Sequence, residues 1–241
     1  MSACWIEPDW PAPAGVRAAS TLRPGGVSRG AYAGLNLGVH VGDDPAHVAA
    51  NRRLLREALN LPAEPIWLNQ IHGVEVIRAD APARLTGDAA VTRRAGIVCA
   101  VMTADCLPIL LCDRAGTGVA AVNAGWRGLA GGVVEAAVAA LNRTDLMAWL
   151  GPAIGPAAFE VGDEVRAAFL GRSGTCADAF RANGEAHWLA DLYQLARRVL
   201  QRAGVCNIYG GEYCTYSDPD RFFSYRRDGL TGRMATLIWR E

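Results

Sequence analysis

Two side chains capable of chemistry interrupt otherwise apolar segments. Cys106 follows a polar break at residues 103–105 within "AVMTADCLPILLCD", and His72 lies in the polar bend "NQIHG". Free cysteine is commonly a small buried hydrophobe, and a lone histidine in such a bend is more often structural than catalytic. If the fold brings the two together, they form either part of a zinc site or a Cys–His dyad for nucleophilic catalysis.

A glycine-rich turn is the third candidate. In "VNAGWRGLAGG", residues 122–132, an apolar strand ends and the chain enters a helix through Gly125 and Gly128. Backbone N–H groups of residues 124–128 could bind an anion together with the helix dipole, and Arg127 could fork onto phosphate or carboxylate. Alternatively, the glycines only allow close helix–strand packing. All three features lie at or beside strand ends, so antiparallel neighbours could bring them together.

Composition limits the chemistry further. The chain has 241 residues, 51% of them apolar, and a formal net charge of zero, which indicates a globular protein without a broad basic surface for nucleic acid. All 24 basic residues are arginine. Schiff-base and phosphate-loop lysines are therefore excluded, and an anion must be held by arginine or by backbone N–H groups.

The sequence also favours a particular compartment. The first 15 residues have neither a basic start nor an apolar core, and no apolar run reaches the roughly 18 residues of a membrane helix. Seven cysteines form no CxxC pair. We therefore expect free thiols in a reducing cytoplasm and no membrane association. Cys99 and Cys112 are expected to be core packing.

The elements that must position these residues are strands and helices mixed without strict alternation. This mixture predicts an α+β fold with a mixed sheet, and we expect one domain over residues 1–241. Buried strands are expected within residues 96–113, 117–124 and 146–155, with "DRAGT" as a tight antiparallel connection. Further strands are expected after residue 16, around the bend in 65–79, and in 207–216 and 233–241. Helices are expected in 43–61, 131–143, 161–170 and 189–204, the first capped by Asp43 or Asp44, and a surface loop in 171–187.

Six ordered motifs together resemble one known family over nearly the whole chain. They are "TLRPGGVSRGAYAGLNLGVHVGDD", "NQIHG", "TADCLPILL", "NAGWRGLAGG", "LGPAIG" and "FFSYRRDGLTGRMATLIW". The family is the YfiH-like, or laccase-domain, family, which includes purine nucleoside phosphorylases and peptidoglycan editing factors. The resemblance implies a single α+β domain similar to a cysteine-hydrolase toxin domain, with a metal site at one end of the sheet.

The implied metal ligands are a His, a Cys and a second His, and they fall on His72, Cys106 and Asn123. The third position is therefore Asn instead of His, which suits zinc poorly because zinc prefers nitrogen and sulfur donors. Zinc, or copper, is the implied cofactor, and we expect its occupancy to be low. His40 is the only other histidine near enough in the pattern to compensate, and we do not expect it to. Asp105 could orient a ligand.

The resemblance implies phosphorolysis of adenosine, inosine, guanosine and methylthioadenosine, with deamination of adenosine. The expected partners are a purine nucleoside and phosphate, and the expected assembly is a monomer or weak homo-oligomer. Phosphate would be held by Arg127 with the 124–128 turn, or by Arg52, and the sugar hydroxyls by Asn36 and Ser224. The catalytic residues would be His72, Cys106 and Arg127.

Other functions remain open from the sequence. One is a cysteine hydrolase or amidase that edits cell-wall precursors, with Cys106 as nucleophile and His72 as base. A second alternative is copper-dependent oxidation of polyphenols. A third is that the protein binds a nucleoside without turnover. Chelators should inhibit a metal-dependent enzyme, whereas thiol alkylation should inhibit a hydrolase.

Overall fold

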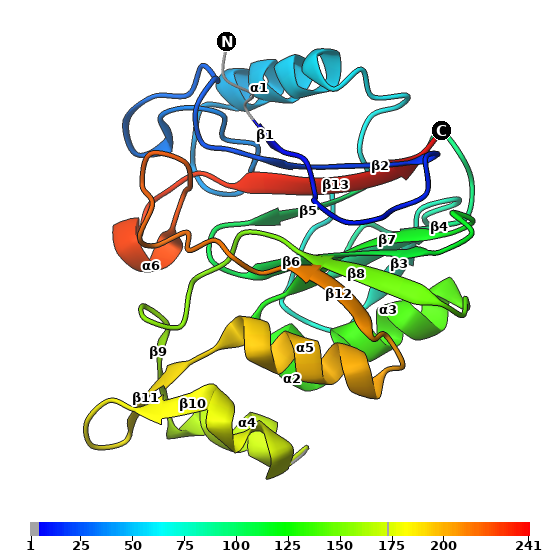
Figure 1. The fold of residues 1–241 in the computed structure, drawn as a ribbon. Coiled ribbons are helices and arrows are strands. Elements are labelled where there is room, and N and C mark those ends of the chain that lie inside the picture. Colours follow the sequence, from blue (N-terminus) through cyan, green and yellow to red (C-terminus); the bar gives the residue numbers. More distant parts are fainter. Residues whose placement is uncertain (1–4, 173) are drawn as a thin grey trace.

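Two β-sheets pack face to face, and helices cover their outer faces (Figure 1). The computed structural model describes residues 5–172 and 174–241. The first sheet has the order β1-β2-β13-β5 and the second has the order β12-β8-β6-β7-β4-β3. Parallel pairs, β12 with β8 and β3 with β4, occur beside antiparallel ones. The predicted α+β fold with mixed sheets is therefore confirmed.

The first sheet comprises β1 (Trp5–Ile6), β2 (Val16–Thr21), β13 (Met234–Arg240) and β5 (Val98–Thr103). The second comprises β12 (Asn207–Gly210), β8 (Leu146–Leu150), β6 (Leu107–Asp113), β7 (Val119–Ala124), β4 (Ala89–Thr92) and β3 (Val76–Arg78). A small third sheet contains β10 (Phe180–Ala182), β11 (His187–Ala190) and β9 (Glu160–Gly162).

The helices are α1 (Pro45–Ala58), α2 (Trp126–Gly131), α3 (Val133–Leu141), α4 (Asp163–Leu170), α5 (Leu192–Arg202) and α6 (Tyr225–Asp228). There are also two short 3₁₀ helices in the described residues, η1 (Gly30–Tyr32) before α1 and η2 (Gly174–Ala179) between α4 and β10. Asp44 caps α1 by accepting a hydrogen bond from the N–H of Ala46, as expected, and Gly204 follows the end of α5 with a φ of 85°.

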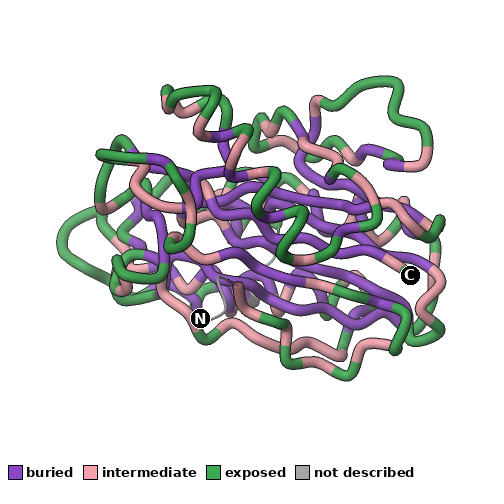
Figure 2. The backbone as a smooth tube through the Cα atoms, turned by 90° about the horizontal axis from the view of Figure 1, so that it is seen from above, coloured by how far each residue is buried: buried purple, intermediate pink, exposed green. Residues whose placement is uncertain are grey.

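Alternating side chains divide the core into layers, and the buried strands run through the middle of the molecule (Figure 2). On β5, Val98 and Ala100 pack toward the layer that includes Leu55 of α1, whereas Cys99 packs between the two sheets with Leu110 of β6. The outer face of the second sheet packs against α3 and α5. Apolar side chains are thus buried between α1 and the first sheet, between the two sheets, and between the second sheet and its helices, and this burial stabilises the fold.

The chain crosses from one sheet to the other between Thr103 and Leu107. Residues 96–113, which read as one buried pattern, are thus two strands: β5 belongs to the first sheet and β6 to the second. Asp105 turns the crossing with a φ of 94°. The crossing exposes part of Cys106 at one end of both sheets, the end where α6 also lies in Figure 1.

Three expectations for the secondary structure were wrong. Residues 171–187 are not a loop throughout, because Cys176 and Phe180 join the core and residues 180–182 pair with β11. Residues 65–71 make only isolated bridges. In 207–216 the strand ends at Gly210, because Gly210 and Gly211 both adopt positive φ angles.

Candidate functional site

His72 and Cys106 meet at the end of the sheets. The Sγ of Cys106 lies 3.7 Å from the Nδ1 of His72, as the sequence led us to expect. Burial, followed by the negative charge of Asp105, raises the pKa of Cys106 to about 12. The cysteine is therefore a neutral thiol near pH 7 in the arrangement described here.

A buried carboxylate holds the bend that carries His72. Asp88 is fully buried and accepts hydrogen bonds from the N–H groups of Ile71, His72 and Gly73 at 3.1, 3.0 and 2.7 Å. His72 has a φ of 58°, a strained conformation for a residue with a side chain, and these bonds fix it. Sequence reasoning missed Asp88. Its signal was an acidic residue directly before the apolar strand β4.

Gln70 ties the same bend to β5. Its side-chain Nε2 donates to the carbonyl of Met102 at 2.8 Å, and its Oε1 accepts from the N–H of Met102 at 2.7 Å. The amide side chain thus takes the place of a neighbouring strand's backbone. The bend is therefore fixed against the sheet, although residues 65–71 make only isolated bridges.

Asn123 ends β7 beside this bend, with 1% of its surface exposed. Its Nδ2 donates to the Oδ1 of Asp88 at 2.8 Å. Because a carboxylate accepts and does not donate, this contact fixes the orientation of the amide. The Oδ1 of Asn123 is buried and has no hydrogen-bond partner within residues 5–172 and 174–241. The residue lines a cavity shared with His72 and Cys106.

The donors at this centre do not fit a zinc or copper site with three protein ligands. His72 and Cys106 are close enough to share an ion, since bonds of 2.0–2.3 Å place donors roughly 3–4 Å apart. The third position offers only the neutral amide oxygen of Asn123. In the described part of the chain, no three His, Cys, Asp or Glu residues are grouped to hold a metal ion.

The two glycines of the 122–132 turn are explained by close packing. A Cβ at Gly125 would lie 2.6 Å from the Sγ of Cys106, and one at Gly128 would lie 3.0 Å from the carbonyl oxygen of Gly73. Arg127 is exposed and lies over the ring of its neighbour Trp126 at 4.4 Å. It does not belong to the cavity wall, so the structure does not support its expected contact with phosphate.

The cavity has a volume of about 510 Å³. Trp126, Ile154 and Phe159 form an apolar side of its wall. The polar side chains on its wall include His40, His72, Asp105, Cys106, Arg226 and Arg233. Both arginines, Trp126 and Phe159 were missed by sequence reasoning. Their only signal was proximity in the chain to recognised motifs.

His40 lies on this wall, although it does not complete a group of metal donors. Burial lowers its pKa, and the nearby charge of Arg233 lowers it further. His40 is therefore a neutral imidazole near pH 7, able to donate one hydrogen bond and accept one.

The expected substrate contacts at Asn36, Arg52 and Ser224 lie outside the cavity wall. Asn36 is fully buried, and its Oδ1 accepts from the N–H groups of Gly38 and Arg233 at 3.0 and 2.9 Å. Arg52 donates to the carbonyl of Leu37 and stacks on a tryptophan. Ser224 caps α6. The structure shows these three residues in supporting contacts, and their contact with a substrate stays a prediction.

The other cysteines expected in the core are buried. Cys99 and Cys112 are both 0% exposed, which confirms that they pack between the sheets. Six cysteines in the described ranges are unpaired thiols.

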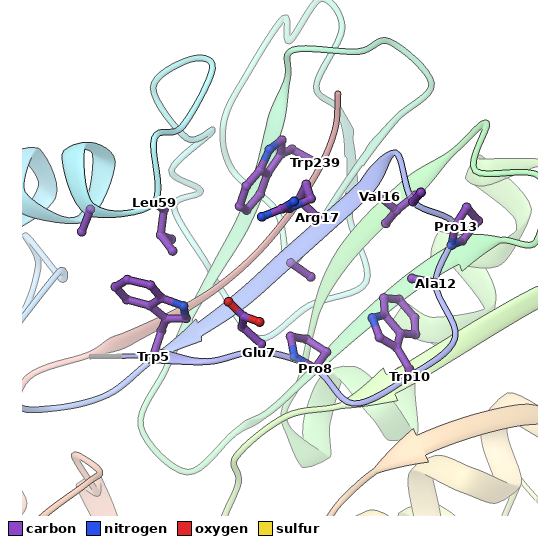
Figure 3. A pocket seen from close by; sticks show the side chains of 13 residues that line it. Trp5, Glu7, Pro8, Trp10, Ala12, Pro13, Val16, Arg17, Leu59 and Trp239 are labelled. Carbon is purple, nitrogen blue, oxygen red and sulfur yellow. The ribbon is translucent and has the colours of Figure 1, made fainter. Parts of the chain in front are cut away.

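A second hollow, of about 380 Å³, lies along β1 and β2 (Figure 3). The side chains around it include Trp5, Glu7, Arg17 and Trp239. None of its described lining residues is histidine or cysteine. It therefore lacks the side chains proposed to react in the cavity around His72.

Comparisons with known proteins agree with this architecture. A family model described as "Multi-copper polyphenol oxidoreductase laccase" matches residues 17–241. The chain is 53% identical over 238 residues to a purine nucleoside phosphorylase, YfiH, of Escherichia coli, covering 97% of this chain and 98% of that protein. It is 52% identical to a purine nucleoside phosphorylase of Pseudomonas aeruginosa, with 98% of each covered.

Solved structures show the same similarity. A Neisseria meningitidis protein of family DUF152 superposes with a TM-score of 0.95 at 52% identity, covering 99% of this chain and 100% of that one. YlmD of Geobacillus stearothermophilus superposes with a TM-score of 0.91 at 32% identity, covering 100% of this chain and 97% of that one.

Proposed function

The chain belongs to the YfiH-like, laccase-domain family, and from this premise we propose that it catalyses phosphorolysis of purine nucleosides in the cavity around His72 and Cys106. The observation that carries the proposal is the joint placement of this pair, an apolar wall and cationic side chains in one cavity of about 510 Å³. A cavity of this size suits a nucleoside and phosphate together.

The apolar wall would bind the base. Trp126 and Phe159 offer aromatic surface for a planar purine, and Ile154 closes the same side. A purine bound there would expose its polar edge to His72 and Cys106. The expected substrates are adenosine, inosine, guanosine and methylthioadenosine.

Phosphorolysis exchanges one bond at C1′ of the ribose for another. An oxygen of phosphate forms a bond to C1′, the C1′–N9 bond breaks with its electron pair moving to the purine, and the purine takes up a proton. His72 and the neutral thiol of Cys106 are the proton donors nearest to this edge in the proposal. Holding the reactants in line supplies much of the rate enhancement.

Zinc or copper, if bound, would use His72 and Cys106 as its protein donors and would act as a Lewis acid. Because the third position is an amide oxygen, the steps above are assigned to the chain's own side chains. The resemblance also implies deamination of adenosine and oxidation of polyphenols, and each would give a distinct product.

A reducing compartment is part of the proposal, and the unpaired cysteines support it. No helix in residues 5–172 and 174–241 has the length and apolar character needed to cross a bilayer. We expect the working enzyme to be cytoplasmic, and a monomer or weak homo-oligomer, which sedimentation would measure.

The test is incubation with inosine and with adenosine, with and without phosphate, followed by separation of the products. We expect free base and ribose 1-phosphate only when phosphate is present. His72→Ala should abolish this, whereas Arg127→Ala, outside the cavity wall, should not. Turnover that ignores phosphate would refute phosphorolysis. Inosine formed from adenosine would reveal deamination, and copper-dependent oxidation of a polyphenol would reveal the oxidase.

A cysteine hydrolase is the second candidate, favoured by the 3.7 Å contact between Cys106 and His72. The raised pKa of Cys106 counts against it, because such a nucleophile works as a thiolate. Loss of turnover on alkylation of Cys106, with hydrolysis products and no need for phosphate, would support it.

A further inference from the structure

Arg233 carries a half-buried charge without a carboxylate partner. Its NH1 donates to the carbonyl oxygens of Thr231 and Gly232, both at 3.0 Å, which fixes the guanidinium against its own loop. Among the described residues, no carboxylate oxygen lies within 4.0 Å of it. Burying a charge is costly unless it is paired, so an anion in the cavity would stabilise this side chain.

Arg226 lies on the same cavity wall but comes from α6. Its NH1 donates to the carbonyl of Glu160 at 2.8 Å, and its guanidinium lies 5.6 Å from the ring centre of Phe159. It also lacks a carboxylate partner within 4.0 Å in the described part of the chain. These contacts hold the charge beside the apolar wall proposed to bind the base.

Asp105 is the acidic residue on this wall, and both of its oxygens are already used. Oδ1 accepts from the hydroxyl of Thr215 at 2.6 Å, and Oδ2 accepts from the N–H of Arg226 at 2.7 Å. The carboxylate thus anchors the start of α6 and leaves the two guanidinium groups unpaired. Two positive charges against one negative charge give this part of the cavity a positive potential.

We propose that Arg226 and Arg233 form the phosphate-binding end of the cavity and hold a phosphate dianion there, with His40 on the same wall as a hydrogen-bonding neighbour. The role of this site as a substrate site rests on the proposed phosphorolysis. Binding of phosphate to the two arginines can be measured without any turnover. One guanidinium group can donate two parallel N–H bonds to two oxygens of a phosphate. Two such groups on different elements can therefore contact different oxygens of one tetrahedral dianion. Asn36 is then a positioning residue, because its Oδ1 accepts from the N–H of Arg233.

The experiment is titration calorimetry of the full chain with inorganic phosphate alone. We expect the Kd for phosphate to rise at least about tenfold in Arg226→Gln and in Arg233→Gln, because each change removes a charge-assisted contact. Arg233→Lys should recover part of the affinity, since it keeps the charge and loses the fork. Arg127→Gln is the matched control and should bind phosphate as the unchanged chain does. Unfolding midpoints of all four variants establish that each is folded.

A second arm titrates adenosine 5′-monophosphate to identify the source of the phosphate group. One outcome is that the nucleotide and inorganic phosphate compete for the site, and that both Gln variants lose binding of each. That result would assign an ester phosphate as well as free phosphate to the same residues. Unchanged phosphate affinity in both folded Gln variants, or loss of affinity in Arg127→Gln alone, would overturn the assignment. Phosphate binding without phosphorolysis would refute only the proposed function. Phosphorolysis with an unchanged KM for phosphate in both Gln variants would refute only this assignment.

Discussion

Asn123 donates a hydrogen bond to the Oδ1 of Asp88 at 2.8 Å, and the same carboxylate accepts three backbone N–H groups from the bend that carries His72. One buried side chain therefore orients two members of the site. The contact also leaves the carbonyl oxygen of Asn123 without a partner in the described ranges, so the polar arrangement of the centre depends on residue 123.

Asn123→His should raise the metal content of the protein. The unchanged chain, with two strong donors at this centre, is expected to purify with well under one zinc per chain. An imidazole at position 123 adds a nitrogen donor, and we expect zinc affinity to rise at least about tenfold. Elemental analysis and competition with a chelator measure this, and Asn123→Ala is the control. Stoichiometric zinc in the unchanged chain would show that the amide oxygen serves as a ligand.

Asp88→Asn should destabilise the fold and disorder the bend. The amide keeps one acceptor oxygen and turns donors toward backbone N–H groups, so buried polar groups lose their partners. We expect the free energy of unfolding to fall by about 2–4 kcal/mol, with loss of turnover. Denaturant unfolding measures the change. Asp145→Asn is the control: Asp145 is exposed and lies 3.5 Å from Arg114, so its loss should cost no more than about 0.5 kcal/mol. Equal effects of the two changes would contradict this role for Asp88.

Gly125→Ala should impair turnover more than stability. The added methyl group would lie 2.6 Å from the Sγ of Cys106 and 3.4 Å from the Nδ1 of His72, so the pair must separate. Displacement by about 1 Å can lower a rate by about 100-fold, and we expect a loss of at least tenfold in kcat. Gly15→Ala, with nothing within 4 Å of the added carbon, is the matched control. Unchanged kcat in Gly125→Ala would show that turnover tolerates a displaced Cys106.

Alkylation of Cys106 by iodoacetamide should be slow and should accelerate with pH. Because the pKa of Cys106 is raised to about 12, the thiolate fraction should grow about tenfold per pH unit from pH 7 to 10 without levelling. Burial raises the pKa of Cys214, but hydrogen bonds from Ser217 and Gly155 outweigh this effect. The pKa of that thiol is therefore lowered. Mass spectrometry should therefore find Cys214 labelled before Cys106, at a rate that becomes independent of pH at a lower pH than for Cys106. Fast labelling of Cys106 at pH 6–7 would instead indicate a thiolate–imidazolium pair.

The sequence predicted the parts of this molecule that depend on local pattern. The cap at Asp44, the antiparallel pair β6–β7 and the burial of Cys112 follow from capping chemistry and from runs of apolar residues. The meeting of His72 and Cys106 was predicted because both residues interrupt apolar segments and both fall on ligand positions that the family resemblance implies. The family resemblance added the third position and the class of reaction.

Contacts between distant segments were beyond the sequence. Asp88 supports His72 across 16 residues of chain through backbone N–H groups, which leave no mark in the pattern of side chains. Arg226 and Arg233 lie near the C-terminal end of the chain, yet they line the same cavity as His72 and Cys106, more than 100 residues earlier in the sequence. The anion role predicted for Arg127 stays a prediction: its motif describes a local turn, whereas the residues that line the cavity come from several distant segments and do not include Arg127.

The bond between Arg233 and Asn36 joins residues 197 positions apart, and β13 is an inner strand of its sheet. During synthesis, β2 and β5 leave the ribosome long before β13 does. Until then the first sheet lacks the strand that joins them, and the cavity lacks Arg226 and Arg233, which lie just before that strand in the chain. The nascent chain is therefore expected to be inactive until β13 emerges. Before that, β2 and β5 have exposed edges that a chaperone could cover.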